Sequence, residues 1–427
     1  MAIKDLIYGS DVDMVAEQEL FRKASEIKTL LETERGRKAL SGIFTKDDKF
    51  LELFLGESTR TDLTFTNAVE ELGGRLHPRL WKFSSMAKGE PMSSLTHFCE
   101  GVRYQGLIMR HDGEEAEALM REALATRNKK NYQIRFINAG MGNKEHPLQK
   151  LKDTFTIQEL FSNELLHGPQ TNNPLRILFC GDVAYSRTIH SLLAVGGIAQ
   201  YGAKIWMTSP EDNQLPDSIR QALLKHRVEF SELHVPLKDA IESAQPHILY
   251  LSRFQFNLRK EWGGRSQEEK NKYEAWYANM VGVTQEVLNI APPFMKILHP
   301  LPQGPELPKR VEDNSRAAYN QQQGNGVPIA MALLIMMFAP NTDLHLLHQD
   351  KHVVTVHART DGGTFSMPSE IGNISRLCIC QGGCGNHTGQ CTAVESKISG
   401  TWGFVSENDF QSITGKGKVF CPQCRPH

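Results

Sequence analysis

The stretch Gly56-Glu57-Ser58-Thr59-Arg60-Thr61 joins an apolar run to a helical pattern. The apolar run, residues 50–55, predicts a buried strand, and the apolar spacing of three and four across residues 63–72 predicts a helix. The first backbone N–H groups of a helix are free, and its dipole is positive at that end. Together with the hydroxyls and the arginine, they form a candidate phosphate site. For this turn alone, the alternative is an N-cap, Ser58 or Thr59, followed by a surface arginine.

The bulk composition limits the classes of protein to consider. The length of 427 residues allows two or three domains, and 40% hydrophobic with 23% charged residues indicates a globular chain. The net charge of −1 gives no sign of a nucleic-acid or membrane binder. No apolar run reaches the length of a membrane span, and the first residues lack the apolar region of a signal peptide. We therefore expect a cytoplasmic protein.

Strand and helix patterns alternate along most of the chain. Further strands are predicted at 106–109, 134–137, 175–180, 203–207, 247–251 and 294–298. A long helix is predicted over residues 10–40 and an apolar one over 328–338, whereas 77–92 has no clear period and is predicted to be a mobile loop. This alternation indicates two α/β domains with parallel sheets, whose ligands bind at the carboxyl ends of strands. Five basic residues at or just after such ends imply anionic substrates: Arg60, Arg110, His146, Arg187 and Arg253.

Several motifs resemble, in order, those of the carbamoyltransferases, and most specifically the aspartate carbamoyltransferases. The resemblance covers roughly residues 1–340 and implies transfer of a carbamoyl group from carbamoyl phosphate to aspartate, the committed step of pyrimidine biosynthesis. The matching motifs are Ser58-Thr59-Arg60-Thr61, Met109-Arg110-His111, His146-Pro147-Leu148-Gln149, Gly181-Asp182 to Arg187-Thr188, Ser252-Arg253-Phe254-Gln255 and His299-Pro300-Leu301-Pro302.

The resemblance also implies a domain plan of two doubly wound parallel-sheet domains and a small β-rich zinc domain. Residues 1–147 would bind carbamoyl phosphate, with the helix at 322–340 returning to them. Residues 148–321 would bind aspartate, and residues 341–427 would form the zinc domain.

Each motif has an implied role. Ser58, Thr59, Arg60 and Thr61 would hold the phosphate, while Arg110, His146 and Thr61 would surround the carbonyl oxygen. Gln149 and the backbone carbonyls around Pro300 and Leu301 would take the carbamoyl amide, and Arg187, Arg253 and Gln255 would bind the carboxylates of aspartate. No covalent nucleophile or catalytic metal is required.

Taken alone, each residue also has an ordinary structural explanation. Arg110 could be a solvent charge at a strand end, and His146 could belong to a common turn. Arg187 could pair with an acid such as Asp182, and Arg253 with Glu261 or another acid. The order of the motifs along one predicted sheet edge favours the functional interpretation.

Ser84 and Lys88 belong to the predicted loop at 77–92. In the family, this loop enters the active site of the neighbouring subunit, and its lysine bridges phosphate and aspartate as a point charge. The resemblance therefore implies a homotrimer with shared active sites. A solvated surface loop is the alternative.

The chain departs from the family pattern at three places. Gly56 stands where the family often has an acid that helps to hold the domains closed through arginines. Gln303 follows His299-Pro300-Leu301-Pro302 where an arginine is common, and Leu258 occupies another arginine position that Arg259 could partly replace. The first departure puts the closure mechanism in doubt and leaves the chemistry unaffected.

Six of the eight cysteines lie in the last fifty residues. Cys380, Cys384, Cys421 and Cys424 form two close pairs that suit tetrahedral Zn²⁺, with Cys378 as an alternate ligand. The tail resembles the zinc domain of the aspartate carbamoyltransferase regulatory chain, and residues 341–377 are too few for that chain's nucleotide-binding domain. We therefore expect structural zinc in an assembly module that could pair trimers. The alternative is a set of free cysteines.

Two other functions compete with this assignment. Ornithine carbamoyltransferase shares the phosphate turn but usually has His-Cys-Leu-Pro where this chain has His299-Pro300-Leu301-Pro302. The other alternative is a catalytically silent scaffold that binds nucleic acid through its zinc tail, against which the near-neutral charge counts.

Overall fold

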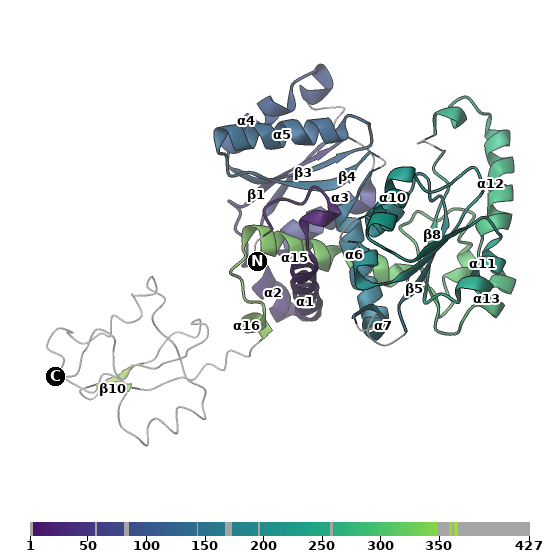
Figure 1. The fold of residues 1–427 in the computed structure, drawn as a ribbon. Helices are drawn as coiled ribbons and strands as arrows, with labels where there is room; N and C mark the ends of the chain where they lie inside the picture. Colours follow the sequence, from purple (N-terminus) through teal and green to yellow (C-terminus); the bar gives the residue numbers. More distant parts are fainter. Residues whose placement is uncertain are drawn as a thin grey trace. The chain divides into compact units, whose positions relative to one another are not determined.

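The computed structural model describes residues 3–55, 58–80, 85–142, 144–166, 173–194, 197–256, 259–348, 358–360 and 363–365. The chain divides into two compact units, Met1–Leu344 and His345–His427, which are described separately. Figure 1 shows that the first unit contains two sheets with their own helices. Ser84, the five cysteines proposed as zinc ligands and the predicted strand at 353–357 lie outside the described residues.

The first sheet has the strand order β2-β1-β3-β4, and all its pairs are parallel. Helices α4 and α5 lie on one face, whereas α1, α3 and α15 lie on the other (Figure 1). Alternate residues Leu51 and Leu53 of β1 join the core beneath α4 and α5, as expected for period-two strands. The strands are β1 Lys49–Phe54, β2 Arg75–Leu80, β3 Tyr104–His111 and β4 Arg135–Met141, and the helices are η1 Gly9–Asp11, α1 Met14–Leu31, α2 Glu34–Leu40, α3 Thr59–Glu71, η3 Ser85–Lys88, α4 Met92–Gly101 and α5 Ala116–Lys130.

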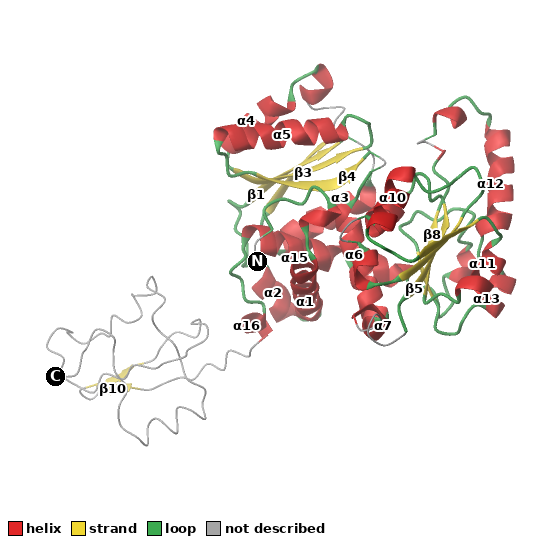
Figure 2. Ribbon diagram, viewed as in Figure 1, coloured by secondary structure: helices red, strands yellow, loops and turns green. Residues whose placement is uncertain are grey.

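The second sheet has the order β7-β6-β5-β8-β9, and it is also parallel throughout. Ile177 and Phe179 pack with α9 and α10, while Leu178 and Cys180 pack with α11 to α13, so both faces are covered (Figure 2). The strands are β5 Arg176–Gly181, β6 Lys204–Thr208, β7 Phe230–Leu233, β8 Ile248–Ser252 and β9 Lys296–Leu298, and the helices are α7 Ser162–Leu166, α9 Arg187–Leu193, η4 Ile198–Tyr201, α10 Asp217–Lys225, α11 Leu237–Ala244, η6 Lys260–Trp262, α12 Gln267–Val281, α13 Gln285–Ile290, η7 Lys309–Val311 and α14 Tyr319–Gly324.

Two buried helices lie where the two sheets approach each other. Helix α6, Pro147–Leu160, leaves β4 and is buried continuously from Pro147 to Ile157. Helix α15, Gly326–Phe338, packs against α1, α3 and α6, and the Phe338 ring meets Phe50 of β1 edge-on at 5.0 Å between ring centroids. A helix that is apolar on all sides must be buried, which explains why α15 returns to the first sheet.

The structure corrects two of the predicted elements. The predicted loop at 77–92 is wrong in part, because β2 runs to Leu80, η3 occupies Ser85–Lys88 and α4 begins at Met92. Residues 81–84 lie outside the described residues, and the predicted mobility stays a prediction. Among the described strands, β2 pairs only with β1, and an edge strand tolerates Pro78 and charged residues that hide its period. The single helix predicted over 10–40 is two helices, because Thr33 caps a new helix by accepting a hydrogen bond from Gly36 N.

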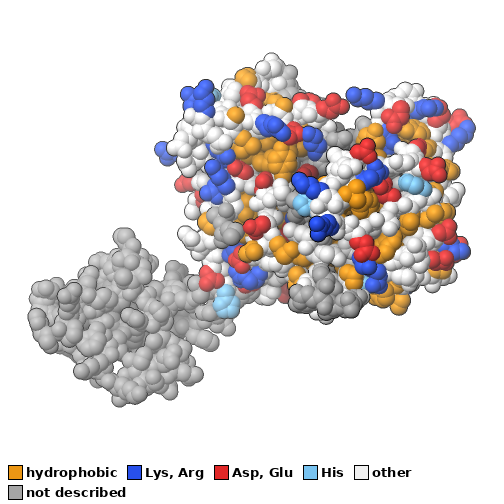
Figure 3. All heavy atoms as spheres, viewed as in Figure 1, with side chains coloured by type: hydrophobic (Ala, Val, Ile, Leu, Met, Phe, Trp, Pro, Cys, Tyr) orange, Lys and Arg blue, Asp and Glu red, His pale blue; other side chains and the backbone are white. Residues whose placement is uncertain are grey.

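In the second unit, the described elements are α16, His345–His348, and a short antiparallel pair, β10 Ala358–Thr360 with β11 Gly363–Phe365. None of the described helices combines the length and apolarity needed to cross a membrane. On the visible face of the described residues, Lys and Arg side chains are interspersed with Asp and Glu (Figure 3).

Candidate active site

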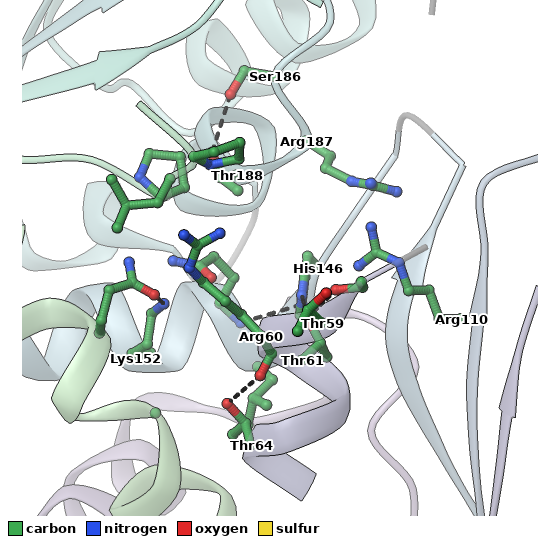
Figure 4. Close-up of a pocket in the computed structure, with 18 of the residues that line it drawn as sticks. Thr59, Arg60, Thr61, Thr64, Arg110, His146, Lys152, Ser186, Arg187 and Thr188 are labelled. Carbon is green, nitrogen blue, oxygen red and sulfur yellow. Dashed lines mark hydrogen bonds between the residues drawn. The ribbon is translucent and has the colours of Figure 1, made fainter. Parts of the chain in front are cut away.

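The carboxyl ends of the two sheets meet at a polar cavity of about 350 Å³ within the first unit. Residues predicted from both halves of the chain line this cavity, together with several that were not predicted (Figure 4). The lining residues are Ser58, Thr59, Arg60, Thr61, Thr64, Arg110, Asp112, His146, Leu148, Gln149, Lys152, Ser186, Arg187, Thr188, Arg253, Gln255, Pro300, Leu301, Pro302, Gln323 and Gly326.

The start of α3 lines the part of the cavity where the sequence predicts phosphate binding. Ser58 is the N-cap residue, but its side chain makes no capping hydrogen bond and donates instead to Thr61 Oγ1 at 2.9 Å. Ser58 and the exposed Arg60 thus take the positions that the N-cap alternative assigns, but no described side chain caps the helix, and the first amides of α3 stay open to a ligand. Arg60 forms no ion pair within 4.0 Å in the described part of the chain. An anion at this helix end would meet amides, hydroxyls and an uncompensated guanidinium.

His146 is the N-cap residue of α6 and is buried. Its backbone N–H donates to Ser191 Oγ at 2.7 Å, and its Nδ1 accepts a hydrogen bond from Gln149 N at 3.4 Å. Nε2 lies 3.4 Å from Thr61 Oγ1. Burial and the nearby cations Arg110 and Arg187 hold the imidazole pKa well below its usual value. The ring is thus neutral near pH 7, with its proton on Nε2, as a hydrogen-bond donor facing the cavity.

Arg110 is a buried arginine near the end of β3, with 6% of its surface exposed. Its Nη1 donates to Ala139 O at 3.2 Å, and burial with the neighbouring Arg187 lowers its pKa to about 10. Gly140 is required beside it, because Gly140 has φ +127° and a Cβ there would lie 3.0 Å from Arg110 Nη1. The solvent-exposed alternative for Arg110 is therefore wrong.

The loop at 299–302 and helix α6 form another part of the cavity lining, and both are held by hydrogen bonds. The Gln149 amide donates to Asp153 Oδ1 at 2.7 Å, which leaves its carbonyl oxygen as a possible acceptor. His299 Nδ1 accepts from Leu301 N at 2.8 Å, and its Nε2 lies 2.9 Å from Glu306 Oε1. The Pro300–Pro302 segment is thereby fixed with its backbone at the cavity.

Arg187, Arg253 and Gln255 come from the second sheet. Arg187 Nη1 donates to Asp112 Oδ1 and to Gly142 O, both at 2.8 Å. Its acidic partner is therefore Asp112 and not Asp182, the acid suggested as the alternative. Arg253 has no ion pair within 4.0 Å among the described residues. Glu261, its predicted alternative partner, instead lies 3.7 Å from Arg259.

Asp182, directly after β5, positions the loop that carries Gln255. Its Oδ2 accepts from Gln255 N at 2.8 Å, and its Oδ1 from Arg259 Nη2 at 3.0 Å. The Arg259 guanidinium also donates to Asn213 Oδ1 at 2.6 Å and lies between the Tyr185 and Phe254 rings at 4.3 and 4.2 Å. Arg259 is thus buried outside the cavity and does not take a substrate-facing position.

Two charged lining residues were missed by the sequence analysis, Asp112 and Lys152. Asp112 follows the predicted Arg110-His111 motif, and Lys152 lies three residues after Gln149 on the same helix face, so both signals were present. Lys88 is exposed on η3 and is not among the cavity residues of the single chain. The roles of Ser84 and of the five cysteines remain predictions.

The comparisons with known proteins agree with this geometry. Residues 4–159 match the family model described as aspartate/ornithine carbamoyltransferase, carbamoyl-P binding domain, and residues 173–337 match the Asp/Orn binding domain of the same family. An aspartate carbamoyltransferase catalytic subunit from Archaeoglobus fulgidus is 30% identical over 334 residues, which cover 78% of this chain and 98% of the relative. The corresponding protein from Methanococcoides burtonii is 32% identical over 67% of this chain and 82% of its own length.

Solved structures give the same result. The catalytic subunit of M. jannaschii aspartate transcarbamoylase superposes with a TM-score of 0.63 and 27% identity, covering 79% of this chain and 99% of that chain. The chain therefore belongs to the aspartate/ornithine carbamoyltransferase family, and it is an enzyme that transfers carbamoyl groups. The two relatives and the solved structure are all catalytic subunits of aspartate carbamoyltransferases.

Proposed function

We propose that this chain is an aspartate carbamoyltransferase, which converts carbamoyl phosphate and L-aspartate into N-carbamoyl-L-aspartate and phosphate. One observation carries the proposal. The open N-terminus of α3 with Arg60, and Arg253 from the other sheet, line one cavity together with the neutral His146, and neither arginine has an ion pair within 4.0 Å among the described residues. Two anionic substrates can therefore be held together, which is how positioning lowers the barrier to a two-substrate reaction.

The chemistry requires the aspartate amine to attack the carbamoyl carbon. A C–N bond forms, the C–O bond to phosphate breaks, and the proton lost by the amine is taken up by the departing phosphate. As negative charge develops on the carbonyl oxygen, Arg110, the His146 N–H and Thr61 stabilise it. The departing phosphate is bound by Arg60 and by the hydroxyls and amides at the start of α3.

The second substrate is assigned to a dicarboxylate. Arg253 and Gln255, together with Arg187, provide donors for two carboxylates, and a bidentate arginine suits each of them. Ornithine carries only one carboxylate and an additional ammonium, which these cations would repel. The near-neutral mixed surface in Figure 3 gives no support to a nucleic-acid scaffold.

The decisive experiment is a transfer assay with purified protein, carbamoyl phosphate and either aspartate or ornithine. We expect turnover with aspartate and at least about 100-fold lower kcat/KM with ornithine, which corresponds to roughly 2.7 kcal/mol of discrimination. Comparable rates with ornithine, or no turnover with either amino acid, would disprove the proposed function.

The active site is proposed to be shared between neighbouring subunits of a homotrimer. The exposed position of Lys88 on η3 supports this, because the side chain is available to another chain. Lys88→Ala and Arg60→Ala trimers should each be nearly inactive. When the two are mixed, dissociated and reassembled, roughly a quarter of the sites should regain activity, by the symmetry of a closed ring. Activity that stays at the level of the separate variants despite demonstrated mixing would assign each site to one chain.

The tail is proposed to bind one structural Zn²⁺ through Cys380, Cys384, Cys421 and Cys424, with Cys378 as an alternate. Support comes from the paired cysteines in the sequence, since four thiolates match the tetrahedral preference of zinc. Elemental analysis should find about one zinc per chain. Cys421→Ser should release the metal while the trimer persists, and loss of the trimer with the metal would contradict an assembly role separate from the catalytic unit. The cytoplasmic location stays a prediction.

A further inference from the structure

Lys152 is a buried lysine in the cavity that the sequence analysis did not single out. It lies in the second turn of α6, with 6% of its surface exposed, and appears beside Arg60 in Figure 4. Its Nζ donates to the neutral amide oxygen of Gln323 at 3.3 Å. Its methylene chain runs close to Gly326, where an added Cβ would lie 3.6 Å from Lys152 Cδ. The side chain thus fills the gap between the helices while its ammonium reaches the cavity wall.

The Lys152 ammonium lacks a carboxylate partner within 4.0 Å in the described part of the chain. Its sequence neighbour Asp153 is engaged elsewhere, because Gln149, Gln322 and Tyr250 donate to its oxygens at 2.7 Å each. Burial, opposed in part by the attraction of the nearby Asp153 and reinforced by repulsion from Arg60, lowers the pKa of Lys152 to about 8. Burial leaves this ammonium with a neutral amide as its direct partner, so a negatively charged ligand in the cavity would stabilise its charge.

A lysine on the same helix shows the contrasting arrangement. Lys150, two residues earlier, forms an ion pair with Glu17, and both side chains are fully buried. Tyr201 Oη donates to the same carboxylate at 2.6 Å. Helix α1 therefore supplies a buried carboxylate to Lys150, whereas no described residue places a carboxylate within 4.0 Å of Lys152, which faces the cavity.

We propose that Lys152 is a further substrate-binding residue of this site, whose ammonium binds the phosphate group of carbamoyl phosphate together with Arg60. The inference rests on the proposed function for the identity of the substrate. The phosphate group carries two negative charges and gains more as its bond to carbon breaks, so a second cation on its side favours both binding and departure. A lysine suits this position because it acts as a point charge and needs no fork geometry.

The test measures binding of inorganic phosphate by calorimetry, and the KM of each substrate, in the Lys152→Met protein. This substitution keeps the methylene chain and removes the charge. We expect the Kd of phosphate and the KM of carbamoyl phosphate to rise about tenfold, with the aspartate KM at saturating carbamoyl phosphate within about twofold of its original value. Lys152→Arg, which keeps the charge, should restore part of the phosphate affinity.

Lys28→Met is the matched control. Lys28 belongs to α1, lies outside the cavity and contacts Asn325 Oδ1 at 2.9 Å, so its loss should leave both substrate constants unchanged. If folded Lys152→Met binds phosphate as tightly as the original protein, the inference is wrong and the side chain serves packing. An equal loss for phosphate and aspartate, accompanied by lower thermal stability, would likewise overturn it.

A second measurement uses the unmutated protein and does not depend on folding of a variant. Acetic anhydride should modify Lys152 near pH 8.5, and inorganic phosphate should slow this modification, followed by mass spectrometry of the peptide that contains it. A modification rate that phosphate leaves unchanged would overturn the inference. Absence of transfer to aspartate in the original protein would instead refute the proposed function, because the phosphate measurements involve no amino acid.

Discussion

The cations on the proposed phosphate side of the cavity differ in their ion pairing from those on the proposed aspartate side. On the phosphate side, neither Arg60 nor Lys152 has a carboxylate within 4.0 Å among the described residues. On the aspartate side, Arg187 pairs with Asp112 and Arg259 with Asp182. Because a cation that lines a cavity without a contacting carboxylate can be neutralised by a ligand there, the unpaired cations mark where we expect substrate charge, whereas the paired cations hold loops in place; burial strengthens this argument for Lys152. By the same criterion, Arg253 is the cation through which aspartate should bind most strongly.

The largest expected effect is at Arg60. Arg60→Ala should reduce kcat/KM by at least about 100-fold, or roughly 3 kcal/mol, because it removes an uncompensated cation from the leaving phosphate. Steady-state kinetics with both substrates varied will measure it. The control is Thr64→Val, which changes a neighbouring lining residue of α3 without altering its charge. If Thr64→Val lowers kcat/KM as much as Arg60→Ala does, the loss comes from disturbed helix packing.

Arg253 should produce the next largest effect, confined to the second substrate. Arg253→Ala should raise the aspartate KM at least about tenfold and leave the carbamoyl phosphate KM within about twofold, since a charged hydrogen-bonded pair contributes roughly 1.5–3 kcal/mol. The same experiment on Arg187→Ala should give a smaller rise, because Asp112 already engages that arginine. A larger rise for Arg187 than for Arg253 would break the distinction between paired and unpaired cations.

Arg259 should act through position rather than contact. Arg259→Met should raise the aspartate KM about fivefold with kcat changed less, because Asp182 then holds the Gln255 backbone less firmly. Arg265→Met is the control, since Arg265 is exposed and lies 5.8 Å from the Trp262 ring centroid. If the carbamoyl phosphate KM rises equally, the effect is a general loss of structure.

The smallest effect concerns stability at Glu52, a buried acid of β1. Burial, and then repulsion by Asp62, raise its pKa to about 8, so between its ordinary value and pH 8 the folded chain binds a proton that the unfolded chain lacks. The free energy of unfolding should therefore fall as pH rises through that window. Glu52→Gln should remove part of this dependence and stabilise the protein by about 1 kcal/mol at pH 8, measured by urea unfolding. A slope that is unchanged in the variant would assign the pH dependence to other groups.

Much of the architecture could be predicted from local patterns. Apolar runs predicted β1, β3, β5 and β8, because strands buried on both faces must be apolar throughout. The edge strand β2 was not predicted, because Pro78 and its charged neighbours show no apolar pattern. The turn before α3 could be predicted as a phosphate site because helix N-termini bind anions by local geometry alone, and that role stays a prediction.

The sequence by itself determined the alternation of strands and helices, the open N-terminus of α3 and the set of cations placed at strand ends. Only the tertiary structure decided which of those cations have partners. Asp112 and Arg187 are far apart in sequence but meet because β3 and β5 end at the same cavity. Lys152 lacks a carboxylate because the helices packed around it contribute Gln323 and Gly326 there. Burial and pairing depend on neighbours from other elements, and those neighbours are fixed by packing rather than by local sequence.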